Sequence, residues 1–260
     1  MEQNLSKKTR TESDLIGSRE VPESALYGVQ TLRGIENFRI SKFHLNEYPL
    51  FIQALAITKM GAAVANRELD LLTEEQTDAI LKACKEILEG KHHDQFPVDM
   101  IQGGAGTTTN MNANEVIANR ALELMGHARG EYQYCSPNDH VNRSQSTNDA
   151  YPTAIHIGLY YTHLKLVKHF ATLIEAFRKK GAEFAHIIKM GRTQLEDAVP
   201  MTLGQTFNGF ASILEHELKN LDFAAQDFLT VNMGATAIGT GITAEPEYAE
   251  KCIAALRKIT

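Results

Sequence analysis

The sequence of 260 residues lacks the features by which several common classes of protein are identified. It contains only three cysteines, Cys84, Cys135 and Cys252, and their wide spacing includes no CxxC pair. A disulfide framework or a cysteine-based metal site is therefore not expected, and a reducing compartment is favoured. The 7 prolines and 18 glycines are too few for a disordered or fibrous chain. No apolar run approaches the roughly 18 residues that a membrane-spanning helix needs.

An excess of basic charge is also missing. The 26 lysines and arginines are outnumbered by 32 aspartates and glutamates, and the net charge of −6 argues against a general nucleic-acid binder. The N-terminal segment MEQNLSKK is polar and lacks the apolar stretch of a secretory signal. What is present, 43% hydrophobic and 22% charged residues, is typical of a globular protein with one large or two small domains. We therefore expect a cytoplasmic protein that binds neither nucleic acid nor membrane.

Helical periodicity dominates the sequence from about residue 50 onward. Residues 1–15 are polar and are expected to be mobile, and residues 16–48 are expected to be irregular with at most short strands. Dense apolar residues without proline predict a helix over 50–69. The capping-box spacing TEEQ opens a second helix at residue 73, which ends at Gly90. A third helix is expected over 115–125.

The two longest helical signals cover residues 153–188 and 202–231. Their apolar residues spread over more than one face, which indicates helices packed against several neighbours, including partners outside this chain. A further amphipathic pattern opens at Pro246, and the sequence stops at Thr260 without a C-cap, as a truncated chain would.

These patterns predict a mainly α fold. We expect an N-terminal helical domain over residues 1–143. The first long helices of a central helical bundle follow over 144–260, as a truncated part of that domain.

Small and hydroxylated residues interrupt the helical pattern in segments 103–112, 144–149 and 191–200. Glycines let backbone approach a ligand, and Ser, Thr and Asn side chains at a helix N-terminus can hold an anion without a metal. The alternative is that these residues only cap or connect helices. A fourth segment, 234–241, resembles a phosphate loop loosely, but no strand precedes it, so we interpret it as close backbone packing.

Other chemical motifs are weak or missing. The run His92-His93-Asp94 can ligate a metal, but a solvated turn after Gly90 explains it more simply. No Walker, HExxH or GxSxG motif occurs. The histidines within the first long helix are expected to be exposed or hydrogen-bonded, namely His156, His163 and His169.

Four of these stretches together resemble the aspartase/fumarase superfamily. They read GGAGTTTNMNAN at 103–114, SPNDHVNRSQSTNDAYPT at 136–153, MGRTQLEDAVPMTLGQ at 190–205 and MGATAIGTG at 233–241. Residues 12–38 are similar to the N-terminal segment of the same enzymes. The resemblance covers nearly all of the chain past residue 12.

Within the superfamily the chain is most similar to the aspartases, the aspartate ammonia-lyases. It has Ser146-Thr147-Asn148 where fumarases usually read Ser-Ser-Asn, and Thr193-Gln194 where they read Thr-His. Ser136 stands where fumarases typically carry histidine. The resemblance implies a carbon–nitrogen lyase, with class II fumarase acting on malate and fumarate as the nearest alternative.

The implied reaction is the reversible anti elimination of ammonia from L-aspartate to give fumarate. Loss of the proton beside the β-carboxylate leaves a carbanion, and the carboxylate must absorb that charge as an aci-carboxylate. Neutral donors aimed at its oxygens lower the barrier by roughly 3–4 kcal/mol each, by analogy with an oxyanion hole.

The resemblance also assigns the substrate-binding residues. Asn148 contacts the substrate amino group or orients neighbouring donors. Gln194 stands where many relatives have histidine, and an amide cannot repeat a proton transfer, so its role stays open. The residues implied to bind the β-carboxylate or its developing charge are Thr107, Ser146, Thr147 and Thr193.

One element of the family is missing from residues 1–260. This is a flexible loop resembling Gly-Ser-Ser-x-Met-Pro-x-Lys-x-Asn-Pro, whose serine is the proposed base and whose lysine binds a carboxylate. The chain therefore resembles the N-terminal half of an aspartase, without a catalytic base and inactive alone. The resemblance implies a homotetramer whose sites draw residues from three subunits, with no required cofactor. It allows activation by a divalent cation, for which no ligand set is evident.

A third interpretation is a catalytically silent structural homologue, since the superfamily includes lens crystallins related to argininosuccinate lyase. The joint presence of Thr107, Ser146 and Thr147 argues against it, because a purely structural role does not need all three.

Overall fold

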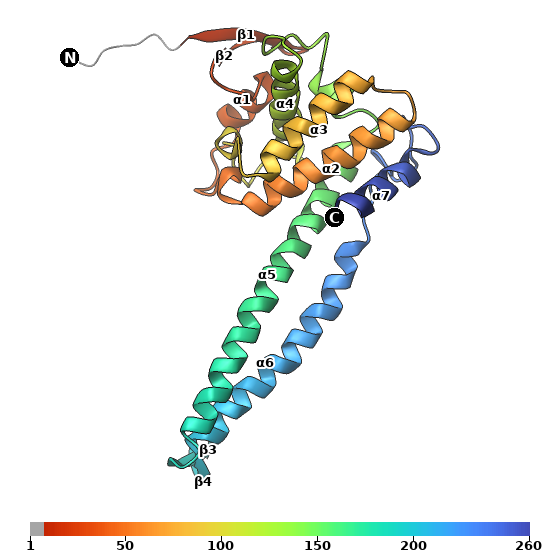
Figure 1. Cartoon of the computed structure of the whole chain (residues 1–260). Coiled ribbons are helices and arrows are strands. Elements are labelled where there is room, and N and C mark those ends of the chain that lie inside the picture. The colour runs from red at the N-terminus through yellow and green to blue at the C-terminus, as the bar shows by residue number, and fades with distance from the viewer. Residues whose placement is uncertain (1–7) are drawn as a thin grey trace, which may run out of the picture. The chain divides into compact units, whose positions relative to one another are not determined.

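The computed structural model describes residues 8–260. The chain divides into two compact units, one formed by residues 1–158 and 231–260 and the other by residues 159–230. Helices dominate both units, so the prediction of a mainly α protein is confirmed (Figure 1). No helix in the described part of the chain combines the length and the apolar character needed to cross a membrane.

The first unit opens with a two-stranded antiparallel hairpin, β1 (Thr9–Asp14) and β2 (Gly17–Pro22). The expectation of a mobile segment over residues 1–15 is wrong for this strand, while residues 1–7 lie outside the described part of the chain. The strand forms because it carries fixed anchors. The buried Glu12 carboxylate accepts from the backbone N–H of Val29, and Arg33 donates to Asp14.

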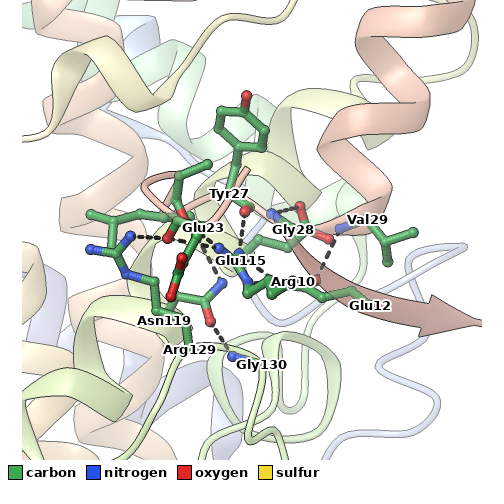
Figure 2. A network of polar contacts seen from close by, with 12 residues as sticks. Arg10, Glu12, Glu23, Tyr27, Gly28, Val29, Glu115, Asn119, Arg129 and Gly130 are labelled. Atoms are coloured by element: carbon green, nitrogen blue, oxygen red, sulfur yellow. Dashed lines mark hydrogen bonds and ion pairs between the residues drawn. The ribbon is translucent and has the colours of Figure 1, made fainter. Parts of the chain in front are cut away.

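Helix α1 (Val29–Asn37) follows the hairpin and is held at its N-terminus by buried carboxylates. Glu115 accepts from the backbone N–H groups of Gly28, Gln30 and Thr31 and from the Thr31 hydroxyl, at 2.6–3.0 Å. Figure 2 shows this cluster, with Glu12 on Val29 and Glu115 on Gly28. Negative charge is favourable at a helix N-terminus, which explains why two carboxylates are buried at one place.

The core of the first unit lies between α2 (Pro49–Glu68), α3 (Glu74–Leu88) and α4 (Thr107–Leu124), and α7 (Tyr248–Ile259) packs on α2. Gly61 lets Leu256 of α7 approach the α2 backbone, where a Cβ would overlap it. Two 3₁₀ helices, η1 (Leu45–Glu47) and η2 (His93–Gln95), and a π-helical turn, η3 (Pro137–Val141), connect these elements. The largest buried side chains of the core include Ile52, Leu55, Ile80, Ile117 and Leu122.

The second unit contains two helices joined by a hairpin. Helix α5 (Thr147–Glu183) begins in the first unit and continues into the second, where α6 (Leu203–Ala225) and the 3₁₀ helix η4 (Gln226–Leu229) follow. Arg178 of α5 pairs with Glu215 of α6 at 2.7 Å, and four aromatic rings pack between the helices. Those rings belong to Phe177, Phe184, Phe207 and Phe210.

The segment expected as a turn between the long helices, 191–200, is a second two-stranded hairpin, β3 (Ile188–Thr193) and β4 (Glu196–Thr202). The helix expected to run to residue 188 therefore ends at Glu183. Gly191 lies at the register shift of the hairpin, where a Cβ would come within 2.9 Å of the Val199 carbonyl. The turn residues Gln194 and Leu195 both have positive φ, as a two-residue hairpin turn of type I′ requires.

Candidate functional site

The polar segment 144–149 forms the N-terminus of α5. The Ser146 hydroxyl accepts from the backbone N–H of Asn148 at 3.2 Å, and Asp149 Oδ1 accepts from the backbone N–H of Ser146 at 2.9 Å. The Ser146 hydroxyl thus caps the first turn of the helix, and the Asp149 carboxylate holds the backbone of Ser146. The capping interpretation accounts for these two residues, and it leaves the side chains of Thr147 and Asn148 with other roles.

Asp149 also anchors the small-residue loop of the fourth segment. Its Oδ2 accepts from the backbone N–H groups of Gly234 at 3.0 Å and Thr236 at 2.9 Å, and the side chain is fully buried. At Gly234 a Cβ would overlap Ala249, which supports the interpretation of this loop as close backbone packing. The carboxylate therefore fixes the start of α5 against the loop that precedes α7.

The loop that precedes α7 also supplies a hydrogen bond that the backbone of α5 lacks. Pro152 lies inside α5 and has no N–H to donate to the carbonyl of Asn148, four residues earlier. Asn232 Nδ2 donates to that carbonyl instead, at 3.0 Å, and Asn148 Nδ2 donates to the Ala237 carbonyl at 2.8 Å. The Asn148 amide nitrogen is thus engaged by backbone, and within residues 8–260 its Oδ1 accepts no side-chain or backbone hydrogen bond and can receive a ligand.

Thr147 is connected to a buried cation through a network of amides. Asn110 of α4 donates to Thr147 Oγ1 at 3.1 Å, and its own Oδ1 accepts from Lys59 Nζ of α2 at 2.7 Å. Lys59 also donates to Asn142 Oδ1 at 3.0 Å and to Gln145 Oε1 at 2.8 Å. With 1% of its surface exposed, Lys59 is fully enclosed. Burial lowers the pKa of its ammonium to about 7, and the charge of Asp149 opposes this shift.

The glycine-rich segment 103–106 leads directly into α4 at Thr107. The helix begins at Thr107, eight residues before the expected start at Glu115, and Thr107 is exposed in its first turn. Gly106 has φ +87°, and a Cβ there would overlap the Tyr151 ring. Gln102 holds the loop against the helix, because its amide both donates to the Thr109 hydroxyl and accepts from the Thr109 N–H.

The glycine loop and Asn148 share one pocket of about 480 Å³ in the first unit. Its lining comes from the loop, from the residues just before it and from the first turns of α5, namely Met100, Ile101, Gln102, Gly104, Ala105, Gly106, Asn148, Tyr151 and Pro152. The structure therefore brings two of the predicted segments together. Thr107 lies at the end of this loop, and Thr147 precedes Asn148 in the chain.

Thr193 and Gln194 belong to the second unit. Thr193 is the last residue of β3 and pairs with Glu196, while Gln194 opens the turn with φ +51°. Both residues are exposed, and the neighbouring Leu195 is almost completely exposed at 97%. Their place is the tip of a hairpin, where side chains project away from the unit that carries them.

The histidines considered as metal ligands have other partners. His92 Nε2 lies 2.8 Å from Glu86 Oε2, and His93 Nε2 lies 2.8 Å from the carbonyl of Ile87. His163, which was expected to be exposed or hydrogen-bonded and not to bind a metal, pairs with Asp222 at 2.9 Å. Among residues 8–260 no group of three or more His, Cys, Asp or Glu side chains is arranged to hold a metal ion.

The arrangement suits a small anion held by neutral donors. The Ser146 and Thr147 oxygens each accept a hydrogen bond from the protein, so each hydroxyl proton can be directed to a ligand. The N-termini of α4 and α5 both favour negative charge. Lys59 was not identified from the sequence, and Asn110 and Asp149 lie in the predicted segments 103–112 and 144–149 but were given no individual role. The available signal was a lysine in the middle of an otherwise apolar helix, Leu50 to Leu69.

Comparison with known proteins gives the relatives of the chain. Residues 17–260 match the model of a protein family described as lyase. The chain is 56% identical over 252 residues to an aspartate ammonia-lyase from Pseudomonas fluorescens, and 53% identical over 257 residues to one from Escherichia coli strain K12. These alignments cover 96% and 98% of this chain and 53% and 54% of the relatives. The chain thus spans about half the length of the curated relatives it matches.

Two solved structures superimpose on nearly the whole chain. The fumarate lyase:delta crystallin from Brucella melitensis, bound to cobalt, superimposes with a TM-score of 0.92 at 51% identity, over 97% of this chain and 55% of that one. A recombinant class II fumarase from Schistosoma mansoni superimposes with a TM-score of 0.88 at 35% identity, over 97% of this chain and 53% of the fumarase.

Proposed function

The chain belongs to the lyase family, and from this premise we propose that it forms the carboxylate-binding part of an aspartate ammonia-lyase. The proposed reaction is the reversible anti elimination of ammonia from L-aspartate to give fumarate. Two aspartate ammonia-lyases are 53–56% identical to nearly the whole chain, which supports this substrate over malate.

The observation that carries the proposal is the hydrogen bonding of Ser146 and Thr147. Asn148 N–H donates to the Ser146 hydroxyl oxygen, and Asn110 donates to that of Thr147, so both hydroxyl protons are available to a carboxylate. Hydroxyls do not titrate near neutral pH, and they strengthen their bonds as charge develops on the carboxylate. This is what a reaction through an aci-carboxylate requires.

We assign the remaining roles by the same chemistry. Thr107, Ser146, Thr147 and Thr193 bind the β-carboxylate. Asn148 receives the substrate ammonium on Oδ1, because its nitrogen is held by the Ala237 carbonyl. Gln194 belongs to the substrate-binding set as a group that cannot transfer a proton. Thr193 and Gln194 complete the site in a homotetramer, in which exposed hairpin residues of one subunit reach the site of another.

The base that removes the substrate proton is proposed to lie outside these 260 residues. No residue of this chain is assigned as the base, and the lysine that binds the second carboxylate is also placed outside it. The chemistry needs no cofactor in this scheme, and activation by a divalent cation is compatible with it.

The test is an assay of the full-length protein that carries this sequence, with aspartate and with malate in parallel. Fumarate formation from aspartate, followed by its ultraviolet absorbance, is expected at a rate far above that from malate. Preference for malate would identify a fumarase, and turnover of neither would identify a silent homologue. The purified 260-residue chain alone is expected to be inactive, and robust turnover by it would refute the assignment of the base.

A further inference from the structure

When Lys59 carries its charge, the amide network around it has only one consistent hydrogen-bond polarity. An ammonium has three N–H donors and no acceptor, so the three oxygens around it must be amide carbonyl oxygens. They are Asn110 Oδ1 at 2.7 Å, Gln145 Oε1 at 2.8 Å and Asn142 Oδ1 at 3.0 Å. Turning the Asn110 amide over would place its NH₂ group against the cation. Lys59 therefore fixes which atom of Asn110 faces each neighbour.

The amide nitrogen of Asn110 faces Thr147, in the predicted substrate-binding segment 144–149. With Oδ1 held by Lys59, Nδ2 lies 3.1 Å from Asn142 Oδ1 and 3.1 Å from Thr147 Oγ1. Asn142 Oδ1 in turn accepts from Lys59, Asn110 and Asn114, so its amide cannot turn over either. Asn110 consequently presents a donor to Thr147 and never an acceptor.

A hydroxyl next to a fixed donor has its own proton directed elsewhere. The Thr147 oxygen accepts from Asn110, and within residues 8–260 its hydroxyl has no other side-chain partner. Its single proton is thus kept for an incoming anion. If the neighbouring atom were an acceptor instead, the proton would turn inward and the lone pairs would face the ligand.

We propose that Lys59 and Asn110 are positioning residues of the lyase site, which together set the polarity of the Thr147 hydroxyl so that it donates to the substrate carboxylate. This inference rests on the proposed function and adds two residues that do not touch the substrate. Lys59 acts through Asn110, and Asn110 acts through Thr147.

A purely structural role for Lys59 explains the observations less well. Its bonds do connect α2, α4 and the segment before α5. A buried cation is costly to desolvate, however, and apolar residues of similar volume serve the packing of helices as well or better. What an apolar residue cannot do is choose the orientation of three amides.

The sharpest test is Asn110→Asp in the full-length protein. The variant has the same shape, and its carboxylate still accepts from Lys59, so the connection between α2 and α4 is kept. The atom facing Thr147 becomes an acceptor, which turns the hydroxyl proton away from the substrate. We expect kcat/KM for aspartate to fall by about 10²- to 10³-fold, as for the loss of one oxyanion-hole donor.

Asn142→Asp is the matched control. It places the same negative charge at a second partner of Lys59 but leaves the Asn110 amide between Lys59 and Thr147. We expect kcat/KM to fall less than tenfold. We expect the two variants to unfold at similar temperatures, because each turns one donor into an oxygen that faces another oxygen, Asn142 Oδ1 in Asn110→Asp and the Gln145 carbonyl in Asn142→Asp. Equal losses in the two variants, or no loss in Asn110→Asp, would overturn the proposal.

A double-mutant cycle tests the part played by Lys59. Lys59→Met and Thr147→Val should each lower kcat/KM, and the double variant should lose little more than Thr147→Val alone, because both act through one hydroxyl. Additive losses would show that Lys59 acts by another route. If Lys59→Met does not fold, the Asn110→Asp comparison still decides the question.

The activity of the unmodified full-length protein distinguishes a failure of the proposed function from a failure of this inference. If the unmodified protein does not turn over aspartate, the proposed function is refuted. If it does and the variants are unaffected, only this inference is refuted.

Discussion

Replacing Asp149 by asparagine removes one acceptor from a buried carboxylate that receives three backbone N–H groups. Oδ1 holds Ser146, and Oδ2 holds both Gly234 and Thr236, at 2.9–3.0 Å. The amide of Asp149→Asn keeps two bonds by turning its oxygen toward the loop. Its nitrogen then faces the N–H of Ser146, and the bond that holds Ser146 at the start of α5 is lost.

The magnitude follows from those three bonds. A hydrogen bond to a charged group contributes about 1.5–3 kcal/mol, and one to a neutral group about 0.5–1.5 kcal/mol. The variant loses one charged bond and converts two others to neutral ones, a loss of about 5 kcal/mol in total. Burying an amide costs less desolvation free energy than burying a carboxylate, and this difference offsets part of the loss. We therefore expect a local destabilisation of about 2–4 kcal/mol.

Hydrogen exchange measures this locally, without assuming that both units unfold together. The amides of Ser146, Gly234 and Thr236 should exchange about 30- to 700-fold faster in Asp149→Asn, at about 1.4 kcal/mol per tenfold. Asp70→Asn makes the same chemical change on a side chain that is 92% exposed, and it should leave these rates unchanged. Unchanged protection of all three amides in Asp149→Asn would refute the reasoning.

Three further predictions concern stability and assembly. Hydrogen bonds, from Arg120 first and also from His92, lower the pKa of Glu86 to about 2. The contacts of this carboxylate should together contribute on the order of 3 kcal/mol above pH 4.5 and lose it as the pH falls toward 2. Urea unfolding against pH should show that loss, and its persistence in Glu86→Gln would contradict the assignment. Gly106→Ala should lower the free energy of unfolding in urea by at least 1 kcal/mol more than Gly90→Ala. The angle φ is +87° at both glycines, but only at Gly106 does the Tyr151 ring occupy the place of the Cβ. Equal losses in the two variants would count against the close approach of Tyr151. The 260-residue chain should self-associate, as measured by light scattering, because its second unit exposes many apolar side chains. They are those of Leu159, Leu164, Leu166, Leu173, Phe210, Ile213 and Phe223. A monomer at high concentration would contradict this prediction.

The sequence was sufficient for elements whose signals are local. Helix α2 covers Pro49–Glu68 against an expected 50–69, and α3 opens with the reciprocal cap between Thr73 and Gln76. Capping and periodicity are properties of neighbouring residues, so they can be read from the chain. The same holds for α7, which begins two residues after Pro246.

Elements that depend on distant residues were missed. Strand β1 is anchored by Val29 and Arg33, and β3 pairs with β4 without a clear alternation of apolar residues. The start of α4 at Thr107 follows four glycine-loop residues that no helical period marks. Partners of this kind become visible only when the chain is folded.

In the candidate site, too, some residues could be predicted from the sequence and others could not. The Ser, Thr and Asn side chains were identified because their types are unusual in a helical sequence. The roles of the residues behind them were not predicted, because a single lysine or aspartate carries no pattern. Lys59 is 51 residues from Asn110, and Asp149 is 85 from Gly234, so only packing brings them together.

The most direct test of the account compares Thr147→Val with Thr147→Ser in the full-length protein. The central claim is that uncharged hydroxyls hold the carboxylate on which charge develops. Thr147→Val keeps the shape and removes the donor, so kcat/KM for aspartate should fall by about 10²- to 10³-fold, while Thr147→Ser should stay within tenfold of the original. A Thr147→Val variant as active as the original protein would contradict the claim.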